Sequence, residues 1–182
     1  MHITKQNFEI KNVGFKNFVN LSAEEKTETL EWRNHEQVRS MMITKDIILL
    51  ETHLLFIQKL VNSNDKVFWV ATYNGQKVGV IYLFDIANSQ AFWGYYLNPK
   101  FIGSGYGILL EYLILEIAFS VFKLSELSCE SLTINKSVIK THQAFGYSTI
   151  TERNFCTIQT INFATFEKQK NMYELLTKKF WE

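Results

Sequence analysis

The residues best placed to do chemistry form a glycine-rich stretch, Gly103-Ser104-Gly105-Tyr106-Gly107. It follows the β-forming run Tyr95-Tyr96-Leu97 and precedes an apolar segment that begins at Ile108. Where a strand passes through glycines into a helix, successive backbone N–H groups converge and the helix dipole adds positive potential. Glycine also lets a ligand approach the backbone closely. The stretch therefore predicts a site for a phosphate or diphosphate.

Two common phosphate-binding motifs do not fit this stretch. A P-loop requires Gly-Lys followed by Ser or Thr, which does not occur here. A dinucleotide fingerprint requires Gly-x-Gly-x-x-Gly, but its last position falls on Ile108 counted from Gly103 and on Leu110 counted from Gly105. The stretch is also too short for the Gly-x-Ser-x-Gly nucleophile elbow. A plain flexible loop before a core helix is the alternative.

With the strand before it, the stretch resembles the acetyl-coenzyme A motif of the GNAT acetyltransferase superfamily, Arg/Gln-x-x-Gly-x-Gly/Ala. Two registers fit the sequence. If Gly105 and Gly107 are the motif glycines, Ile102 stands at the Arg/Gln position. If Gly103 and Gly105 are the motif glycines, Lys100 stands there. Because backbone N–H groups hold the diphosphate, a missing Arg or Gln does not abolish binding.

A second segment, Asn135 to Tyr147, resembles the superfamily signature Asn-x-x-Ala/Ser-x-x-x-Tyr-x-x-x-Gly-Phe. Asn135 matches the residue that contacts the pantetheine arm of the cofactor. His142 falls at the signature tyrosine, so the resemblance implies that it protonates the leaving thiolate of coenzyme A. An unperturbed histidine titrates near pH 6.5, so both of its forms are available at neutral pH. A surface position on a short helix is the alternative.

The resemblance implies acetyl-coenzyme A as co-substrate and a direct attack by an amine in a ternary complex. In the family, a backbone N–H of a splayed strand faces the thioester oxygen, at Tyr96 or Leu97 here. The implied cofactor-binding residues are Tyr96, Leu97, Ile102, Gly103, Ser104, Gly105, Tyr106, Gly107 and Asn135. Glu130 corresponds to a glutamate that faces the substrate and takes or holds the amine proton, with a solvent-facing strand residue as the alternative.

The segment Trp32-Arg33-Asn34-His35 resembles the ribosomal-protein-acetylating branch and its amino-sugar relatives. With the segment 52–57, it is similar to the acetyltransferases of pseudaminic acid biosynthesis. The implied acceptor is the 4-amino group of a UDP-linked amino-dideoxy sugar, UDP-4-amino-4,6-dideoxy-N-acetyl-β-L-altrosamine, whose product enters flagellin glycans. The implied substrate-binding residues are Arg33, Met42, His53, Phe56 and Phe92. Each of these residues has an alternative. Arg33 could pair with Glu31 or Glu36, His53 could be a satisfied semi-buried histidine, and the Met and Phe residues could be plain core.

The elements that must position these residues have an α/β order. The resemblance implies an α+β GNAT fold, with a mixed, mostly antiparallel central sheet that is splayed at the cofactor site and flanked by about four helices. Ser22 and Glu25 form a capping box at the start of the first helix. Expected helices cover about residues 22–34, 49–61, 108–122 and 135–145. Expected strands cover about residues 9–16, 67–73, 78–84, 91–97, 127–132, 147–151, 157–163 and 172–176.

Composition excludes several classes of protein. The 182 residues fit a single domain, 1–182, and a net charge of +1 with scattered Lys and Arg provides no nucleic-acid-binding stripe. No apolar run reaches the roughly 20 residues needed to cross a bilayer. Cys129 and Cys156 lack metal or redox spacing and predict reduced thiols in a cytoplasmic protein. We expect no metal, and a homodimer is an option through an aromatic C-terminal strand near Phe180-Trp181.

Two other functions remain open from the sequence. One is a protein N-terminal acetyltransferase, like those that act on ribosomal proteins. The other is a non-catalytic sensor that binds acetyl-coenzyme A, because both the motif Arg/Gln and the signature tyrosine are replaced.

Overall fold

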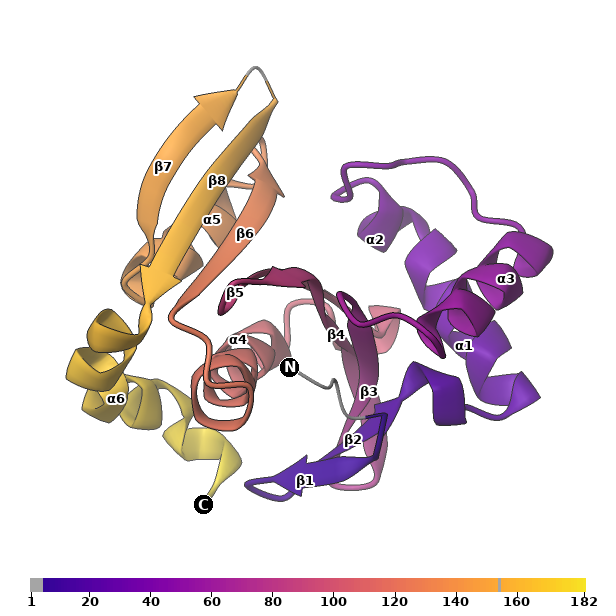
Figure 1. Cartoon of the computed structure of the whole chain (residues 1–182), viewed down its shortest axis with the longest axis horizontal. Coiled ribbons are helices and arrows are strands. Elements are labelled where there is room, and N and C mark those ends of the chain that lie inside the picture. Colours follow the sequence, from indigo (N-terminus) through magenta and orange to yellow (C-terminus); the bar gives the residue numbers. More distant parts are fainter. Residues whose placement is uncertain (1–4, 154) are drawn as a thin grey trace.

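The computed structural model describes residues 5–153 and 155–182. Their backbone forms one mixed eight-stranded sheet in the order β1-β2-β3-β4-β5-β6-β8-β7 (Figure 1). All neighbouring strands are antiparallel except β5 and β6, which are parallel. The strands are β1 Phe8–Ile10, β2 Val13–Asn17, β3 Val67–Tyr73, β4 Gln76–Ala87, β5 Gln90–Leu97, β6 Glu126–Leu132, β7 Ser148–Arg153 and β8 Cys156–Asn162.

The hairpin between β3 and β4 turns at Asn74-Gly75, as the sequence predicts. Both turn residues have positive φ, 48° and 73°, which is the geometry that favours Asn-Gly in a two-residue hairpin. The predicted first strand is instead a hairpin, because Lys11 and Asn12 also take positive φ and reverse the chain between β1 and β2.

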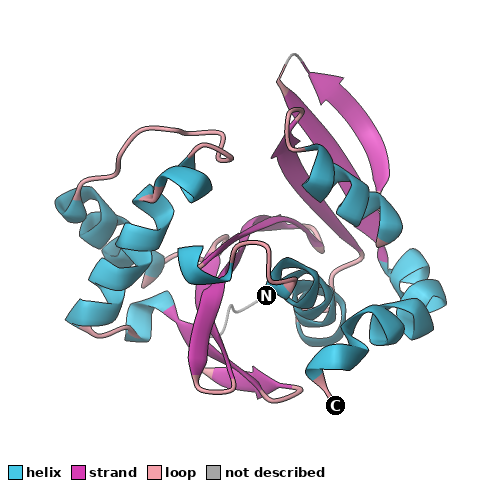
Figure 2. Ribbon diagram, turned by 180° about the vertical axis from the view of Figure 1, so that it is seen from behind, coloured by secondary structure: helices cyan, strands magenta, loops and turns pink. Residues whose placement is uncertain are grey.

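The sheet opens between its two central strands. The pairing of β5 with β6 extends only from Gln90 opposite Glu126 to Trp93 opposite Cys129. Beyond these pairs the two strands diverge, which Figures 1 and 2 show as a gap between β5 and the β6-β8-β7 half of the sheet. The splayed sheet that the sequence resemblance implies is therefore present.

Six α-helices surround this sheet in the described part of the chain. Helices α1 to α3 cover one face of β3 to β5 and α4 covers the other, whereas α6 packs beside α4 and against β8 (Figures 1 and 2). The segment that follows α4 continues as a π-helix, Glu116–Val121. The helices are α1 Ala23–Asn34, α2 Glu36–Arg39, α3 Leu50–Leu60, α4 Tyr106–Leu115, α5 Lys136–Ala144 and α6 Phe163–Thr177.

Helix α4 is the central element of the larger hydrophobic core. All its residues from Leu109 to Leu115 are buried, so it is the buried core helix that its apolar sequence predicts. Glu111 is buried with them. Because the N-terminus of α4 emerges beside the end of β5, the core holds the glycine-rich stretch at the opening in the sheet.

Helix α3 turns a different face to the core than its apolar spacing indicates. Of the residues Leu50, Leu54, Ile57 and Val61, which the sequence places on one face, only Ile57 is buried. The buried face is instead completed by His53 and Leu60. A histidine thus replaces an aliphatic residue at a core-facing position, which the hydrophobic pattern alone does not reveal.

The C-terminal segment differs from its prediction. Residues 172–176 were predicted as a strand, but they belong to α6, which buries Phe166, Tyr173 and Thr177 on one helical face. Phe180 and Trp181 do not form a strand either, since they lie in and after the short 3-10 helix Lys178–Phe180. Their side chains are partly buried and pack against the main core. The homodimer stays a prediction.

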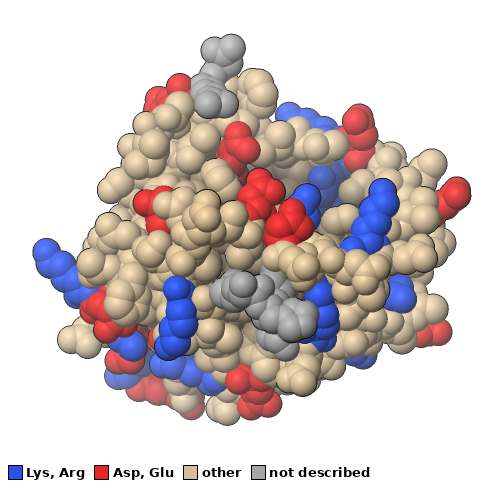
Figure 3. All heavy atoms as spheres, in the orientation of Figure 1, with Lys and Arg blue, Asp and Glu red and all other residues tan. Residues whose placement is uncertain are grey.

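The charged side chains are dispersed on the surface. Figure 3 shows Lys and Arg interspersed with Asp and Glu on the face viewed in Figure 1. Among the described residues, no helix is both long and apolar enough to cross a membrane. Both cysteines are buried and free.

Helix α1 begins with the predicted capping box. The Ser22 hydroxyl accepts from the Glu25 N–H at 3.2 Å, and the Glu25 carboxylate accepts from the Ser22 N–H at 2.9 Å. The same carboxylate binds Lys16 of β2 at 2.7 Å and lies 3.6 Å from Lys77 of β4. One glutamate therefore caps the helix and attaches it to the sheet.

Replacing Ser22 with Ala should lower the free energy of unfolding by about 1 kcal/mol, because the Glu25 N–H loses its acceptor. Urea denaturation measures this loss. Thr27→Ala on the same exposed helix is the control, since the Thr27 hydroxyl bonds only back to the Ala23 carbonyl. An equal loss in both variants would contradict the capping role.

Candidate functional site

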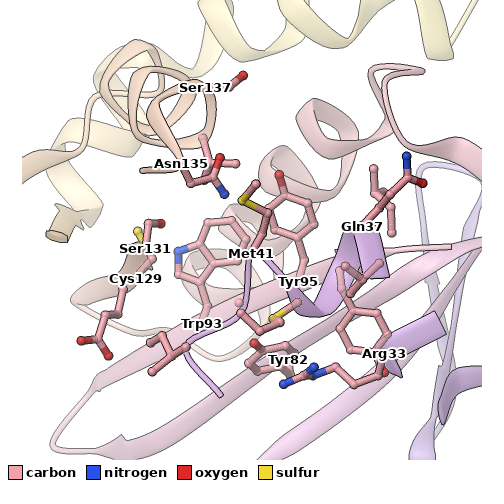
Figure 4. A pocket seen from close by; sticks show the side chains of 18 of the residues that line it. Arg33, Gln37, Met41, Tyr82, Trp93, Tyr95, Cys129, Ser131, Asn135 and Ser137 are labelled. Carbon is pink, nitrogen blue, oxygen red and sulfur yellow. The ribbon is translucent and has the colours of Figure 1, made fainter. Parts of the chain in front are cut away.

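A cavity of about 530 Å³ lies where β5 and β6 diverge. Side chains and backbone from both halves of the sheet form its wall, together with residues before α4 and from α1 and α5 (Figure 4). Of the predicted site residues, this wall contains Arg33, Met42, Tyr96, Leu97, Ile102, Gly103, Glu130, Asn135 and His142. The fold thus brings together residues from distant parts of the sequence.

The open side of β5 presents backbone donors to this cavity. Asn98 donates its N–H to Val78 at the end of β4, at 3.0 Å. Since successive N–H groups of a strand point to opposite sides, those of Tyr95 and Leu97 point away from β4 and toward the gap. Of the two predicted oxyanion donors, the alternation favours Leu97, because the N–H of Tyr96 faces β4.

The glycine-rich stretch folds as a loop that leads into α4. Gly105 is the N-cap of the helix with φ 89°, and Gly103 has φ 83°, which are conformations that glycine adopts without strain. Tyr106 and Gly107 open the helix, where N–H groups lack intrahelical acceptors. The Ser104 hydroxyl accepts weakly from the Tyr106 N–H at 3.4 Å. The register with Gly105 and Gly107 therefore places both motif glycines at the helix N-terminus.

At this loop, the side chain of Tyr106 packs against other aromatic rings, so Tyr106 offers a ligand its backbone. Its ring stacks on Phe180 with centroids 5.5 Å apart and meets Phe101 and Tyr73 edge-on. The Tyr73 hydroxyl donates in turn to the Phe180 carbonyl. The C-terminal segment therefore supports the loop from outside.

Lys179 is a charged residue at the loop that sequence reasoning did not find. A Cβ built on Gly105 would lie 2.7 Å from the Lys179 Nζ, so the ammonium group rests on the N-cap of α4. The Arg/Gln position of the motif is occupied by Ile102, which is uncharged. Lys179 supplies a positive charge that the loop itself lacks. No local pattern links the two segments, because the contact depends on the tertiary fold.

His142 forms a buried pair with Glu111. Its Nδ1 lies 2.8 Å from Glu111 Oε1, and the two residues are 2% and 0% exposed. The surface position considered for His142 is therefore wrong. The ring meets Trp93 edge-on with centroids 5.5 Å apart and lies 5.2 Å from the Tyr147 ring. Because Nδ1 faces Glu111, the Nε2 edge is the one left for the cavity.

Burial raises the pKa of the Glu111 carboxyl, while its hydrogen bond to His142 acts in the opposite direction. The second carboxylate oxygen, Oε2, is buried without a hydrogen-bond partner among the described residues. The sequence offered one signal for this residue, a glutamate within an otherwise apolar helix.

Glu130 lies on β6 just beyond the last residue that pairs with β5. It is exposed and belongs to the cavity wall. Its position at the opening places a carboxylate within reach of both solvent and a ligand, which suits a group that passes a proton to water.

Arg33 projects from the last turn of α1 to the wall of the cavity, where Figure 4 shows its guanidinium beside Tyr82. Its Nη2 donates to the Thr44 carbonyl at 2.8 Å, and its Nη1 is buried without a partner among the described residues. Burial lowers the pKa of this guanidinium. Among the described residues Arg33 pairs with neither Glu31 nor Glu36, and Glu36 binds Arg39 instead. A buried, unpaired N–H group suits an anionic ligand.

A second cavity of about 330 Å³ adjoins the first. Arg33, Tyr82 and Tyr96 contribute to both walls. Its remaining wall is Phe18, Ile48, Thr52, His53, Phe56 and Phe68. Apart from Arg33, Thr52 and His53, this surface is apolar or aromatic and suits a planar or apolar part of a ligand.

His53 and Phe56 are therefore at the second cavity and not at the first. The His53 Nε2 lies 3.4 Å from the Thr29 hydroxyl, and burial lowers the pKa of its imidazole, so a satisfied, neutral histidine is favoured. Phe92 lines neither cavity in the described structure. It packs on Phe84 with ring centroids 5.5 Å apart, and Phe84 takes the predicted place in the wall of the first cavity.

Within the described residues, no group of three or more His, Cys, Asp or Glu side chains is arranged to hold a metal ion. The polar groups of the site are instead isolated charges, backbone N–H groups and the buried pair. Such a set can bind an anion, orient a carbonyl and move a proton.

Comparison with known proteins gives this geometry a family context. Residues 17–148 match the model of the acetyltransferase (GNAT) domain. The acetyltransferase PseH of Campylobacter jejuni strain 81-176 is 30% identical over 131 residues, which cover 72% of this chain and 82% of the relative. The PseH of strain NCTC 11168 matches with the same identity and coverage.

Solved structures share the fold at lower identity. The crystal structure of Campylobacter jejuni N-acetyltransferase PseH in complex with acetyl coenzyme A matches with a TM-score of 0.70 and 22% identity, and covers 83% of this chain and 99% of that one. The spermidine N-acetyltransferase of Vibrio cholerae, in complex with CoA and spermine, matches with a TM-score of 0.76 and 13% identity, over 87% and 99% of the two chains.

Lys179→Ala should weaken the binding of acetyl-coenzyme A about three- to tenfold, because a diphosphate at the loop would lose one partly screened cation. Isothermal calorimetry at low and high salt measures the effect, which should shrink as salt increases. Lys178→Ala is the matched control, since Lys178 pairs with Glu182 at 2.9 Å and not with the loop. The proposed contact would be excluded if both variants weakened binding equally, or if neither weakened it.

Proposed function

The chain belongs to the GNAT acetyltransferase family, and we propose that its acceptor is the 4-amino group of a UDP-linked amino-dideoxy sugar of pseudaminic acid biosynthesis. As a member of this family it is an acetyl-coenzyme A-dependent N-acetyltransferase. The substrate proposal rests on the environment of Arg33. Its unpaired, buried N–H group lies between the cavity at the strand opening and the aromatic second cavity.

The first cavity and the loop at the start of α4 suit the acyl donor. Backbone N–H groups at the start of α4 and the ammonium group of Lys179 would hold its diphosphate. The open edge of β5 would take the pantetheine arm, with Asn135 on the opposite wall. When bound, acetyl-coenzyme A supplies a thioester that an amine can attack directly. The N–H of Leu97 would stabilise the charge that develops on the carbonyl oxygen.

The acceptor side would use Arg33 and the second cavity. A guanidinium binds phosphate oxygens in bidentate fashion, which suits the diphosphate of a nucleotide sugar. The aromatic wall around Phe56 and Tyr82 would take the base or the deoxysugar. Met42, in the wall of the first cavity, would contact the sugar near its reacting amine. Similarity of the segments 31–39 and 52–57 to the amino-sugar branch supports the same assignment.

Two residues would move protons. Glu130, exposed at the opening, would accept the proton of the attacking amine directly or through water. His142 would protonate the leaving sulfur through Nε2, in place of the tyrosine of the family signature. Tyr95 also lines the cavity, but burial and then the nearby Glu111 raise the pKa of its phenol, so it is the poorer proton donor.

A protein N-terminal acetyltransferase is the second candidate, because the ribosomal-protein branch shares the Trp-Arg-Asn segment. A peptide acceptor would require a groove that remains open along the cavity. The buried guanidinium of Arg33 and the aromatic second cavity favour a small anionic substrate instead. We also propose that the enzyme is cytoplasmic, because its proposed substrates would be supplied there.

An assay of thiol release across a panel of amines tests the substrate. We expect UDP-4-amino-4,6-dideoxy sugars to give a kcat/KM at least about tenfold above that of N-terminal peptides and polyamines, because only they fill the second cavity and pair with Arg33. Faster turnover with peptides would support the second candidate. Binding of acetyl-coenzyme A without turnover of any amine would support the sensor function.

His142→Ala should lower kcat about 10- to 100-fold, since a positioned acid is lost while the thiolate is already a good leaving group. The affinity for acetyl-coenzyme A should change by less than about threefold, because backbone groups hold the cofactor. Steady-state kinetics and calorimetry measure the two quantities. Unchanged turnover in a folded variant would remove His142 from the mechanism.

A further inference from the structure

The pair of Glu111 and His142 is unusual in its position. Glu111 is the one charged residue in the run Leu109–Leu115 of the core helix, and it is completely buried. Binding the cofactor through backbone N–H groups does not require a carboxylate there. A buried carboxylate is costly unless a partner compensates its charge. His142, at 2.8 Å, is its only ion-pair partner among the described residues.

In the part of the chain that the structure describes, the surroundings of Glu111 provide no other counter-charge. Aromatic rings of Trp93 and Tyr147 flank the imidazole. Among the described residues, four other titratable groups interact electrostatically with Glu111. They lie on β5, β6, α6 and the segment after α5, and they are Tyr95, Cys129, Tyr147 and Tyr173. Burial raises the pKa of each of these groups, so all four are neutral at neutral pH. The charge state of the pair therefore depends on Glu111 and His142 together.

We propose that Glu111 is a positioning residue that makes His142 the proton donor of the reaction, by holding the Nδ1 hydrogen and keeping the ring protonated until Nε2 delivers its proton. The inference rests on the role of His142 in the proposed function. It explains why a histidine can replace the signature tyrosine. A buried phenol carries its proton without a counter-ion, whereas a buried imidazole loses its charge unless an anion is beside it.

The proton transfer balances within the site. Before it, the pair consists of an imidazolium and a carboxylate, with Nδ1–H donated to Glu111. During it, the Nε2–H bond breaks and an S–H bond forms on the leaving thiolate. His142 is then neutral, still donating Nδ1–H to the carboxylate, and the negative charge has moved from the sulfur to the pair. Water returns a proton to Nε2 after the thiol leaves, while the amine proton departs through Glu130.

Glu111→Gln tests this role, because it keeps the shape and an acceptor oxygen but removes the charge. The proton of His142 should then be lost at lower pH, since a neutral amide stabilises the imidazolium less than a carboxylate. We expect the decline of kcat at high pH to begin about one unit lower. On the high-pH side of the profile kcat should fall about tenfold, and it should recover toward the parent value at lower pH.

Glu116→Gln is the matched control. Glu116 follows α4 directly, is partly buried and accepts from the Tyr112 and Ser120 hydroxyls at 2.8 and 3.0 Å, with no contact to His142. Its pH profile should match that of the parent. Measurements of thermal unfolding and of the Kd for acetyl-coenzyme A would check that both variants remain folded and bind the donor.

A second measurement does not require the substrate amine. Nitrogen-15 NMR of the four histidine rings in the full chain, assigned with His142→Gln, follows the protonation of His142 directly. Its titration midpoint should fall by about one unit in Glu111→Gln and stay unchanged in Glu116→Gln.

A lower NMR midpoint together with the shifted kcat profile would support the proposal. Loss of kcat by the same factor at every pH would make Glu111 a purely structural residue and overturn it, as would an unchanged NMR midpoint. Normal turnover in His142→Gln would overturn both the donor role of His142 and the role of Glu111. If no amine is turned over, the proposed substrate fails, and the NMR titration alone decides on the pair.

Discussion

The loss of backbone pairing between β5 and β6 after Trp93 and Cys129 is the constraint on which the site depends. Inside a sheet, each N–H and C=O group requires a partner, so a strand edge that opens into a cavity calls for a ligand to complete it. The N–H of Leu97 is such a group. Helix α4 begins beside the same opening, because its buried residues fix it against the sheet. The two sets of free donors thus converge without any charged residue in the loop.

The charged groups of the site come from five different elements. Arg33 projects from α1, Glu130 from β6, the pair of Glu111 and His142 joins α4 to α5, and Lys179 follows α6. Because aromatic and apolar walls separate them, each can act on a different part of a ternary complex. The diphosphate of the donor, the leaving sulfur, the attacking amine and the anionic acceptor have separate partners in the proposed arrangement.

Local patterns predicted much of this fold. The capping box of Ser22, the Asn74-Gly75 turn and the glycine loop were found from the sequence because a few neighbouring residues determine each of them. Strand 172–176 was predicted wrongly, since the alternation there is equally compatible with the helix that buries Tyr173.

The site was only partly predictable for a related reason. The family motifs located the loop, Asn135 and His142, but not the side chains that the fold brings to them. Glu111 precedes His142 by a whole strand and a helix, and the contact of Lys179 with Gly105 requires α6 to return across the core. Phe92 was chosen in place of Phe84, its antiparallel partner, because sequence does not show which of two facing aromatic residues reaches the cavity.

The support of the glycine loop by the C-terminal segment has a consequence for how the protein is made. Ribosomes release a chain from its N-terminus onward, so the N-terminal segments of a domain are free to fold before the later ones are made. The strands can assemble around α4 while later residues are still being synthesised, but Phe180 and Lys179 reach the loop only after α6 has been made. A nascent chain would therefore acquire its sheet before its donor-binding loop is fully braced.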